Sequence, residues 1–330
     1  MKNGVAVANN TCLSRDGLMR DSQEANHAQD DGRSPDGNVH GYTTPEKMEI
    51  VQFAPPAALA PFVTQIYFFR CDENHIRDLQ PAALGHLVFL LRGTGNLRFQ
   101  DGHVDTLHPV SVFGPGLAAA EFTFAGPLND FGLALSPLGF VALTGKPANA
   151  YADRAVAASD LFGVEIDELA TRFSKGHADG SMRLAQMVEE VTAFLLTRIR
   201  PVPPRHVVMI QTVIGWLSSD LDPDVEILYA GLDMSRSTAA RLIARYFGTA
   251  PKPLMRKYRA LRAASILCDP ACTPELRHSI ESLFYDQPHM IREIRQFAGR
   301  TPGALDGDDS KIMRIWLSKE NYRDIETYPG

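Results

Sequence analysis

Cysteine is scarce in this chain of 330 residues, which has four of them. Cys12, Cys71, Cys268 and Cys272 do not follow the spacing of a disulfide framework, and Cys268 and Cys272 lack the second pair that a zinc site would need. Long apolar runs are lacking too, which excludes a transmembrane helix, and the N-terminus has no apolar core of a secretory signal. These absences predict a cytoplasmic protein with no membrane association.

Signatures of catalysis are also missing. We find no phosphate-binding loop, no nucleophile elbow and no pair of carboxylates at a catalytic spacing. Histidines occur in the first half of the chain at His75, His86, His103 and His108, but their spacing matches no compact metal-ligand motif. The sequence therefore predicts a protein that is not an enzyme, with no catalytic residues, no metal and no cofactor.

Positive charge is in deficit overall but is concentrated in one region. The net charge is −6, which taken alone argues against nucleic acid as a partner. The stretch from Met234 to Cys268, however, contains no Asp or Glu at all. We call its eight basic residues the basic island: Arg236, Arg241, Arg245, Lys252, Arg256, Lys257, Arg259 and Arg262. Local clusters of this kind, rather than the whole-chain charge, decide whether phosphates are attracted.

Changes in composition divide the chain into four parts. Residues 1–46 are polar and without apolar periodicity, which predicts disorder. Residues 47–200 begin with short runs rich in Val, Phe and Leu, typical of a β-sandwich or barrel with a hairpin turn at Asp101-Gly102, and end in helices. Prolines at 201, 203 and 204 mark a boundary. Residues 205–306 are predicted to be all helical, and 307–330 form an acidic tail. The fold class is α+β.

A helix, a turn and a second helix are predicted between Asp224 and Gly248. In the first helix we expect Val225, Ile227, Leu228 and Ala230 to supply the apolar face. Ser235 is placed to cap the second helix. Arg241 and Arg245 are four residues apart and share the face opposite the buried one, with Ser237 one turn earlier. A short helix with exposed arginines and a small residue near its start suits entry into a major groove.

The same arrangement recurs about fifty residues later. Glu275–Leu283 is predicted to form a helix, Asp286 caps the next one, and Pro288 falls in its first turn. Gln287, His289 and Arg292 remain outward on that helix. Both units end in Gly followed closely by Pro, and between them Pro253–Cys268 is one continuous helix. On this joining helix we expect Arg256, Lys257 and Arg259 to be solvated or directed at phosphates.

The strings APKPLMRKYRALRAASIL and FYDQPHMIREIRQFAGRTPGAL, with both units in order, resemble the arabinose-regulator (AraC/XylS) type of bacterial transcription factors. The resemblance covers roughly residues 206–306. It implies that two recognition helices sit in successive major grooves on one face of double-stranded DNA. The chain departs from the family pattern at Leu283, where a turn glycine is usual, and at Pro288. Whether the second unit reads bases is left open.

The sequence thus predicts a sequence-specific, DNA-binding transcriptional regulator. The residues expected to contact DNA are Arg236, Ser237, Arg241, Arg245, Gln287, His289 and Arg292. For His289 a structural role at the turn is an equal alternative. The β-rich domain is expected to sense a small-molecule effector or to form a homodimer, and RNA polymerase is a further partner left open.

Two other functions stay open at this point. One is a degenerate family member that acts as a protein-interaction module. The other is a DNA-repair alkyl acceptor, which would need a reactive cysteine, with Cys71 the candidate in the β-rich domain.

Overall fold

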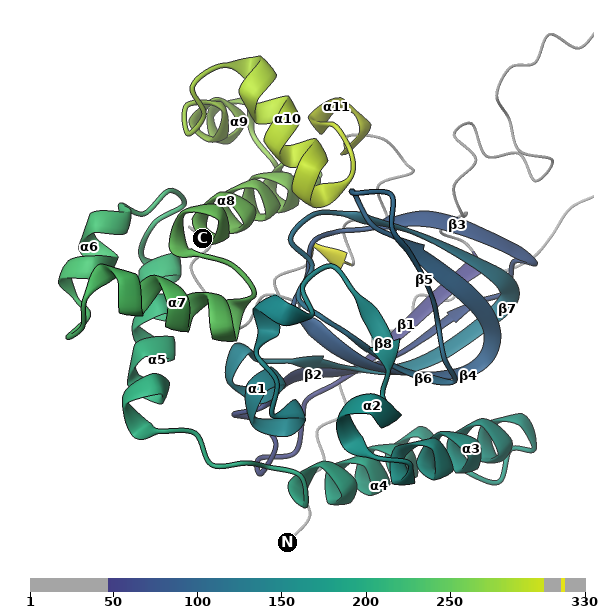
Figure 1. The fold of residues 1–330 in the computed structure, drawn as a ribbon. Coiled ribbons are helices and arrows are strands. Elements are labelled where there is room, and N and C mark those ends of the chain that lie inside the picture. Colours follow the sequence, from purple (N-terminus) through teal and green to yellow (C-terminus); the bar gives the residue numbers. More distant parts are fainter. Residues whose placement is uncertain (1–46, 306–315, 318–330) are drawn as a thin grey trace, which may run out of the picture. The chain divides into compact units, whose positions relative to one another are not determined.

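The computed structural model describes residues 47–305 together with Trp316 and Leu317. The predicted disordered segment 1–46 and nearly all of the predicted acidic tail lie outside the described residues. Strands come first along the chain: β1 (Met48–Phe53), β2 (Val63–Cys71), β3 (His75–Gln80), β4 (Gly85–Arg98), β5 (Val104–Thr106), β6 (Val110–Phe113), β7 (Ala120–Leu135) and β8 (Ala155–Ala157). Helices α1 to α11 follow β7 (Figure 1). The predicted α+β fold class is confirmed.

The strands form one antiparallel sheet in the order β1-β2-β7-β4-β6-β8, with β3 on β7 and β5 on β4. The long strands β4 and β7 organise it, because β7 pairs with β2 through its second half and with β3 through its first half. The predicted hairpin at Asp101-Gly102 joins β4 to β5, and Gly102 has a φ of 87° that favours glycine.

Alternation along the strands gives the sheet two faces with different neighbours. On β4, Leu87, Phe89 and Leu91 face a core shared with the helices, and Phe89 packs against Phe173 at a ring separation of 5.1 Å. His86 and Val88 face the other way, into a cavity. One residue of register therefore decides whether a side chain supports the helical layer or lines the cavity.

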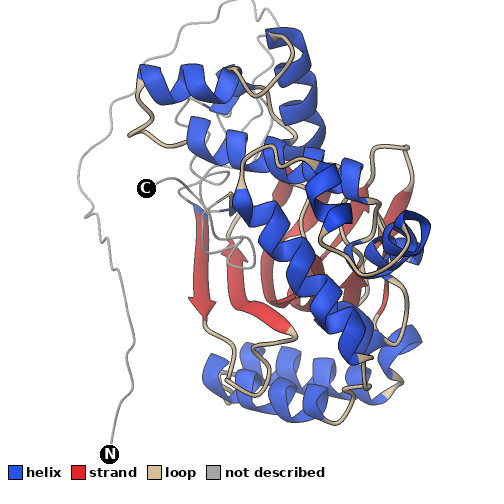
Figure 2. Ribbon diagram, turned by 90° about the vertical axis from the view of Figure 1, so that its left-hand side faces the viewer, coloured by secondary structure: helices blue, strands red, loops and turns tan. Residues whose placement is uncertain are grey.

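Two helices cover the first face of the sheet. They are α3 (Glu165–Ala178) and α4 (Leu184–Leu196), which run side by side below the sheet in Figure 1 and at the bottom of Figure 2. The apolar spacing from about residue 160 to 173 predicts a single helix. Instead Gly163, with a φ of 86°, separates a short α2 (Ser159–Phe162) from α3. The prediction of a single helix is wrong because the apolar spacing continues across Gly163, whose backbone is not helical.

Of the remaining helical segments, two come before the proline segment 201–204, and the others begin at its end or later. The first is α1 (Pro137–Thr144), with the turn η2 (Ala148–Ala150) after it. The others are α5 (Pro204–Ser219), α6 (Val225–Ala230), α7 (Arg236–Phe247), α8 (Pro251–Leu267), α9 (Pro274–Glu281), α10 (Gln287–Ala298) and α11 (Pro302–Leu305). Among the described residues no helix is long and apolar enough to cross a membrane.

The C-terminal ends of α7 and α10 touch loops at one rim of the sheet. Gly248, which ends α7, lies against Pro115, and Gly299, which ends α10, lies against Leu79 and Ala119. We call the loop residues Gln80–Leu84 and Gly114–Ala119 the rim. Its backbone bonds directly to α10, since the Ala82 amide donates to the Phe297 carbonyl at 2.8 Å and the Ala119 amide to Gln296 at 2.8 Å.

A buried ion pair strengthens this contact. Arg300, just after α10, donates to Asp78 on β3 at 2.5 Å, and the two side chains are 6% and 0% exposed. We expect Arg300→Met to lower the free energy of unfolding by about 3 kcal/mol, because it leaves the Asp78 carboxylate buried without this cation. Chemical denaturation of the full chain measures the change. Arg295→Met, at an exposed position on α10, is the control, and an equal loss in both variants would contradict the prediction.

Candidate nucleic-acid interface and ligand cavity

The first predicted unit is present as α6 and α7. The Ser235 hydroxyl caps α7 by accepting from the Thr238 amide at 3.3 Å, as expected, and Gly248 ends it with a φ of 86°. Ala239, Ile243, Tyr246 and Phe247 are buried. One face of α7 is thus buried, and the opposite face is left to the solvent.

Exposed side chains cover the outer face of α7. Ser237, Arg241 and Arg245 are all exposed. Arg241 and Arg245 border a groove of about 1120 Å³ that runs between α7, α5 and the proline segment. Arg205 lies on the same groove and is exposed. It is not among the residues predicted to contact DNA, because it lies outside both predicted units.

Arg236 is engaged within the protein. Its guanidinium donates to both carboxylate oxygens of Glu226, with Nη1 3.0 Å from Oε1, and it lies 5.2 Å from the centre of the Tyr229 ring. The predicted apolar face of α6 is partly wrong, since Ile227 is 68% exposed and Ala230 is exposed, and only Leu228 is fully buried. Helix α6 is six residues long, too short to bury one continuous stripe.

The second predicted unit is present as α9 and α10. Asp286 caps α10 by accepting from the His289 amide at 2.7 Å, and Pro288 lies in the first turn. Gln287 and Arg292 are exposed. The intervening turn carries Tyr285, whose side chain is 93% exposed.

The joining helix α8 differs from the expectation, because most of its positive charge is turned inward. Lys257, Arg259 and Arg262 are buried, with exposures of 2%, 7% and 2%. The Lys257 ammonium donates to the carbonyls of Ala83 at 2.8 Å and Gly116 at 2.7 Å, both in the rim. The prediction that Arg256, Lys257 and Arg259 are solvated or directed at phosphates is therefore wrong for Lys257 and Arg259. No local pattern indicates this burial, because the carbonyl partners of Lys257 lie 174 and 141 residues away in the chain.

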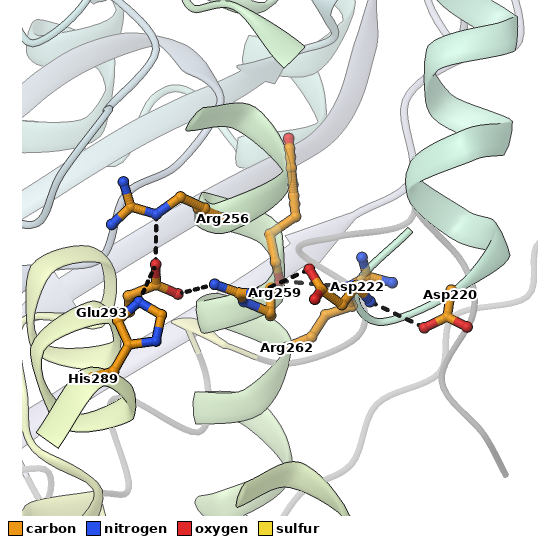
Figure 3. Close-up of polar contacts among 8 residues, drawn as sticks. Asp220, Asp222, Arg256, Arg259, Arg262, His289 and Glu293 are labelled. Carbon is orange, nitrogen blue, oxygen red and sulfur yellow. Dashed lines mark hydrogen bonds and ion pairs between the residues drawn. The ribbon is translucent and has the colours of Figure 1, made fainter. Parts of the chain in front are cut away.

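Glu293 on α10 is the shared carboxylate partner of Arg256 and Arg259 on α8 (Figure 3). It is 1% exposed and accepts from Arg256 at 2.5 Å and from Arg259 at 2.6 Å. Arg259 also donates to Asp222 at 2.9 Å. Burial acts to raise the pKa of Glu293, but the hydrogen bonds from Arg259 and Arg256 outweigh it and hold the pKa below its ordinary value.

His289 lies beside this cluster instead of pointing outward. Its Nε2 is 3.2 Å from the Glu293 carboxylate, its side chain is 29% exposed, and its ring meets Phe284 edge-on at 6.0 Å. This placement matches the structural alternative that the sequence left open for His289.

A separate cavity lies on the second face of the sheet, lined by residues of β1 to β4, β6 and β7. Its volume is about 130 Å³. Aromatic rings make up much of its wall: Tyr67, Phe69, Phe113, Phe122, Phe124 and Trp316. Tyr67 crosses β7 at Gly132, where any Cβ would come within 2.2 Å of the tyrosine ring, so only glycine admits this arrangement.

Polar atoms without partners face this cavity. They are Nε2 of Gln65, Oδ1 of Asp130 and Nδ1 of His86. Burial raises the pKa of Asp130 to about 8 and lowers that of His86 to about 4, and it raises that of Tyr67 as well. At neutral pH all three groups are therefore uncharged. A cavity that is mostly aromatic with a few convergent polar groups is typical of a small-molecule site.

Cys71 lacks the features of an alkyl acceptor. Its side chain is fully buried, and burial raises the pKa of the thiol to about 11. A buried, protonated thiol is a poor nucleophile, so this alternative loses its reactive group.

Comparisons with known proteins add little to this geometry. Residues 51–157 match a family described as a domain of unknown function (DUF6597). A comparison with curated proteins finds no match.

Solved structures give distant likenesses. ToxT from Vibrio cholerae, with (E)-4-(8-methylnaphthalen-1-yl)but-3-enoic acid bound, is 9% identical over 82% of this chain and 100% of its own, with a TM-score of 0.44. The AraC-like transcriptional activator CuxR is 13% identical over 66% of this chain and 86% of its own, with a TM-score of 0.26. Likenesses at this level assign no ligand and no residue role to the chain.

Proposed function

We propose that this chain is a sequence-specific DNA-binding transcriptional regulator of the arabinose-regulator type. Residues 205–306 would bind double-stranded DNA, and residues 47–200 would sense a small molecule in the aromatic cavity. The observation that carries the proposal is the second helix of the first unit, α7, which is capped, buried on one side and free of acidic residues on the other. The family resemblance of the sequence supports the same function.

Within this proposal the side chains have unequal roles. Arg241 is the best candidate to read a base, because an arginine that donates two hydrogen bonds to guanine is the commonest specific contact. Ser237 and Arg245 flank it on the same face, and Arg205 would bind a phosphate along the groove. In the second unit, Gln287 and Arg292 are free to contact DNA. Arg236 and His289 have carboxylate partners in the protein, so we expect them to contribute less to DNA binding.

We expect Arg241→Ala to weaken binding to the specific site by about 1–3 kcal/mol and to relax specificity at one base pair. Binding sites selected from a random DNA pool, followed by fluorescence anisotropy, measure both effects. Arg98→Ala removes an exposed arginine from β4 and is the matched control. An equal loss on specific and random DNA would mean that Arg241 contacts only a phosphate.

A protein-interaction module is the second candidate function. It is favoured by the inward turn of Lys257, Arg259 and Arg262, which leaves less positive charge for DNA than the sequence suggested. The salt dependence of binding separates the two functions. DNA binding predicts that log K falls with log salt in proportion to the number of phosphates contacted, whereas a slope near zero on all DNA would favour the interaction module.

A further inference from the structure

The aromatic cavity holds a buried carboxyl group with no cation beside it. Asp130 on β7 is 9% exposed and its Oδ1 has no partner. On β2, Phe69 lies opposite Asp130 and Tyr67 lies two positions further along, and on β4, His86 lies opposite Ala134, four positions from Asp130 along β7. None of these side chains carries positive charge at neutral pH. Lys257 does not line the cavity and is held by two carbonyls of the rim.

The unpartnered polar atoms of the cavity favour a ligand that donates hydrogen bonds. A hydrogen bond engages His86 with the Leu84 backbone, so the unpartnered Nδ1 of the neutral ring is an acceptor. Asp130 Oδ1 is a second acceptor. Gln65 Nε2 is the one free donor of the three. An ammonium group donates to Asp130 and, by taking the place of its proton, forms a charge-assisted hydrogen bond with the carboxylate. A carboxylate ligand can accept from Gln65 Nε2 and from the protonated Asp130 carboxyl group, but the negative faces of the aromatic rings oppose it.

The walls favour the same ligand. The faces of aromatic rings attract a cation, and this attraction grows when the cation is removed from water. The volume of about 130 Å³ approaches that of an engineered cavity of about 150 Å³ that takes up benzene. The ligand is therefore about one ring in size.

We propose that the cavity binds a small organic amine in its protonated form, with the ammonium group on Asp130 and an apolar body about one ring in size among the aromatic side chains. The inference rests on the proposed function in treating the cavity as the sensor site. Trp316 connects the site to the helices, because its ring meets Phe122 at 5.5 Å and the next residue, Leu317, accepts a hydrogen bond from Ser265 on α8 at 2.7 Å.

The first experiment compares benzylamine, benzyl alcohol and benzoate on the full chain. Binding is followed by the melting temperature and by tryptophan fluorescence, and Trp316→Phe identifies the signal that comes from the cavity rather than from Trp216, the other tryptophan. We expect benzylamine to bind at least roughly tenfold more tightly than benzyl alcohol, and benzoate not to bind. Equal or tighter binding of the alcohol or of benzoate would overturn the proposal, and so would failure of all three probes to bind.

The second experiment uses Asp130→Asn. We expect the variant to lose the preference for the amine while it keeps its affinity for benzyl alcohol, which also shows that its cavity is intact. Glu121→Gln, an acid-to-amide change on the same strand with its side chain paired to Arg77, should keep the preference. Unchanged amine binding by Asp130→Asn would refute the assigned contact.

A third measurement needs no variant. The carboxyl group is mainly protonated at about pH 7, since its pKa is about 8, and an ammonium ligand would ionise it. Calorimetry of benzylamine binding in two buffers with different ionisation enthalpies should therefore show release of close to one proton. No proton release would contradict an ammonium–carboxylate contact.

Failure of this inference is distinguishable from failure of the proposed function. DNA binding is measured on the same protein without any probe. DNA binding without amine selectivity would leave the regulator standing and reject the ligand class. Amine selectivity with no salt-dependent DNA binding would support the ligand class and reject the DNA-binding regulator.

Discussion

Glu293→Gln is expected to lower the free energy of unfolding by about 3–5 kcal/mol, the usual cost of removing one partner from a buried ion pair. The side chain is 1% exposed and accepts from two arginines of α8. The amide keeps the shape but removes the negative charge, and its NH₂ group would face a guanidinium that can only donate. Arg256 and the buried Arg259 would then share one neutral acceptor.

Chemical denaturation at neutral pH measures this loss, and Glu189→Gln is its control. Glu189 is exposed on α4, so the same chemical change there should leave stability unaltered within error. If Glu293→Gln were as stable as the control, the α8–α10 contact would be held by apolar packing alone. If the second unit melted separately, before the rest of the chain, this would be a further sign that the α8–α10 contact is weakened.

Stability should fall as pH rises between about 4 and 8 because of Asp130. Its pKa is about 8 in the folded protein, against an ordinary value of 3.8 for an aspartate side chain. In this window the folded state keeps a proton that the unfolded chain releases, so the free energy of unfolding decreases by up to about 1.4 kcal/mol per pH unit. The contribution is fully present below about pH 4 and is lost as pH passes 8.

Asp130→Asn removes the titration, so the stability of the variant relative to wild type should increase steadily across this window. His86 has its pKa lowered to about 4 and makes stability rise with pH over the lower part of the range, but it is present in both proteins and cancels in the difference. Glu121→Gln, on the same strand, should show no such trend. A constant difference between Asp130→Asn and wild type from pH 4 to 8 would show that Asp130 is ionised in the folded state.

Local signals predicted much of the helical region correctly. The caps at Ser235 and Asp286 and the glycines after α7 and α10 lie where the sequence places them, because a cap is decided by residues three or four positions away. The spacing of Arg241 and Arg245 likewise follows from helix geometry alone, and both are exposed.

What the sequence did not reveal depends on contacts between distant segments. Lys257 bonds to carbonyls 174 and 141 residues away, and Glu293 meets Arg259 across 34 residues. Both residues would pass as surface charges on an amphipathic helix. The cavity is a similar case, since Asp130 looks like a turn residue within an interrupted apolar run, and only strand register turns it inward beside Tyr67.

The glycines that end α7 and α10 have a consequence for the spacing of DNA sites. Both abut the rim, one at Pro115 and the other at Ala119, and the second also meets Leu79 on β3. If both helices enter DNA, their separation is fixed by the sheet as well as by α8, so the rim sets the phase between two stretches of sequence. Lengthening the loop Gly114–Ala119 would then alter which operator spacing the protein prefers, without changing any residue that touches a base.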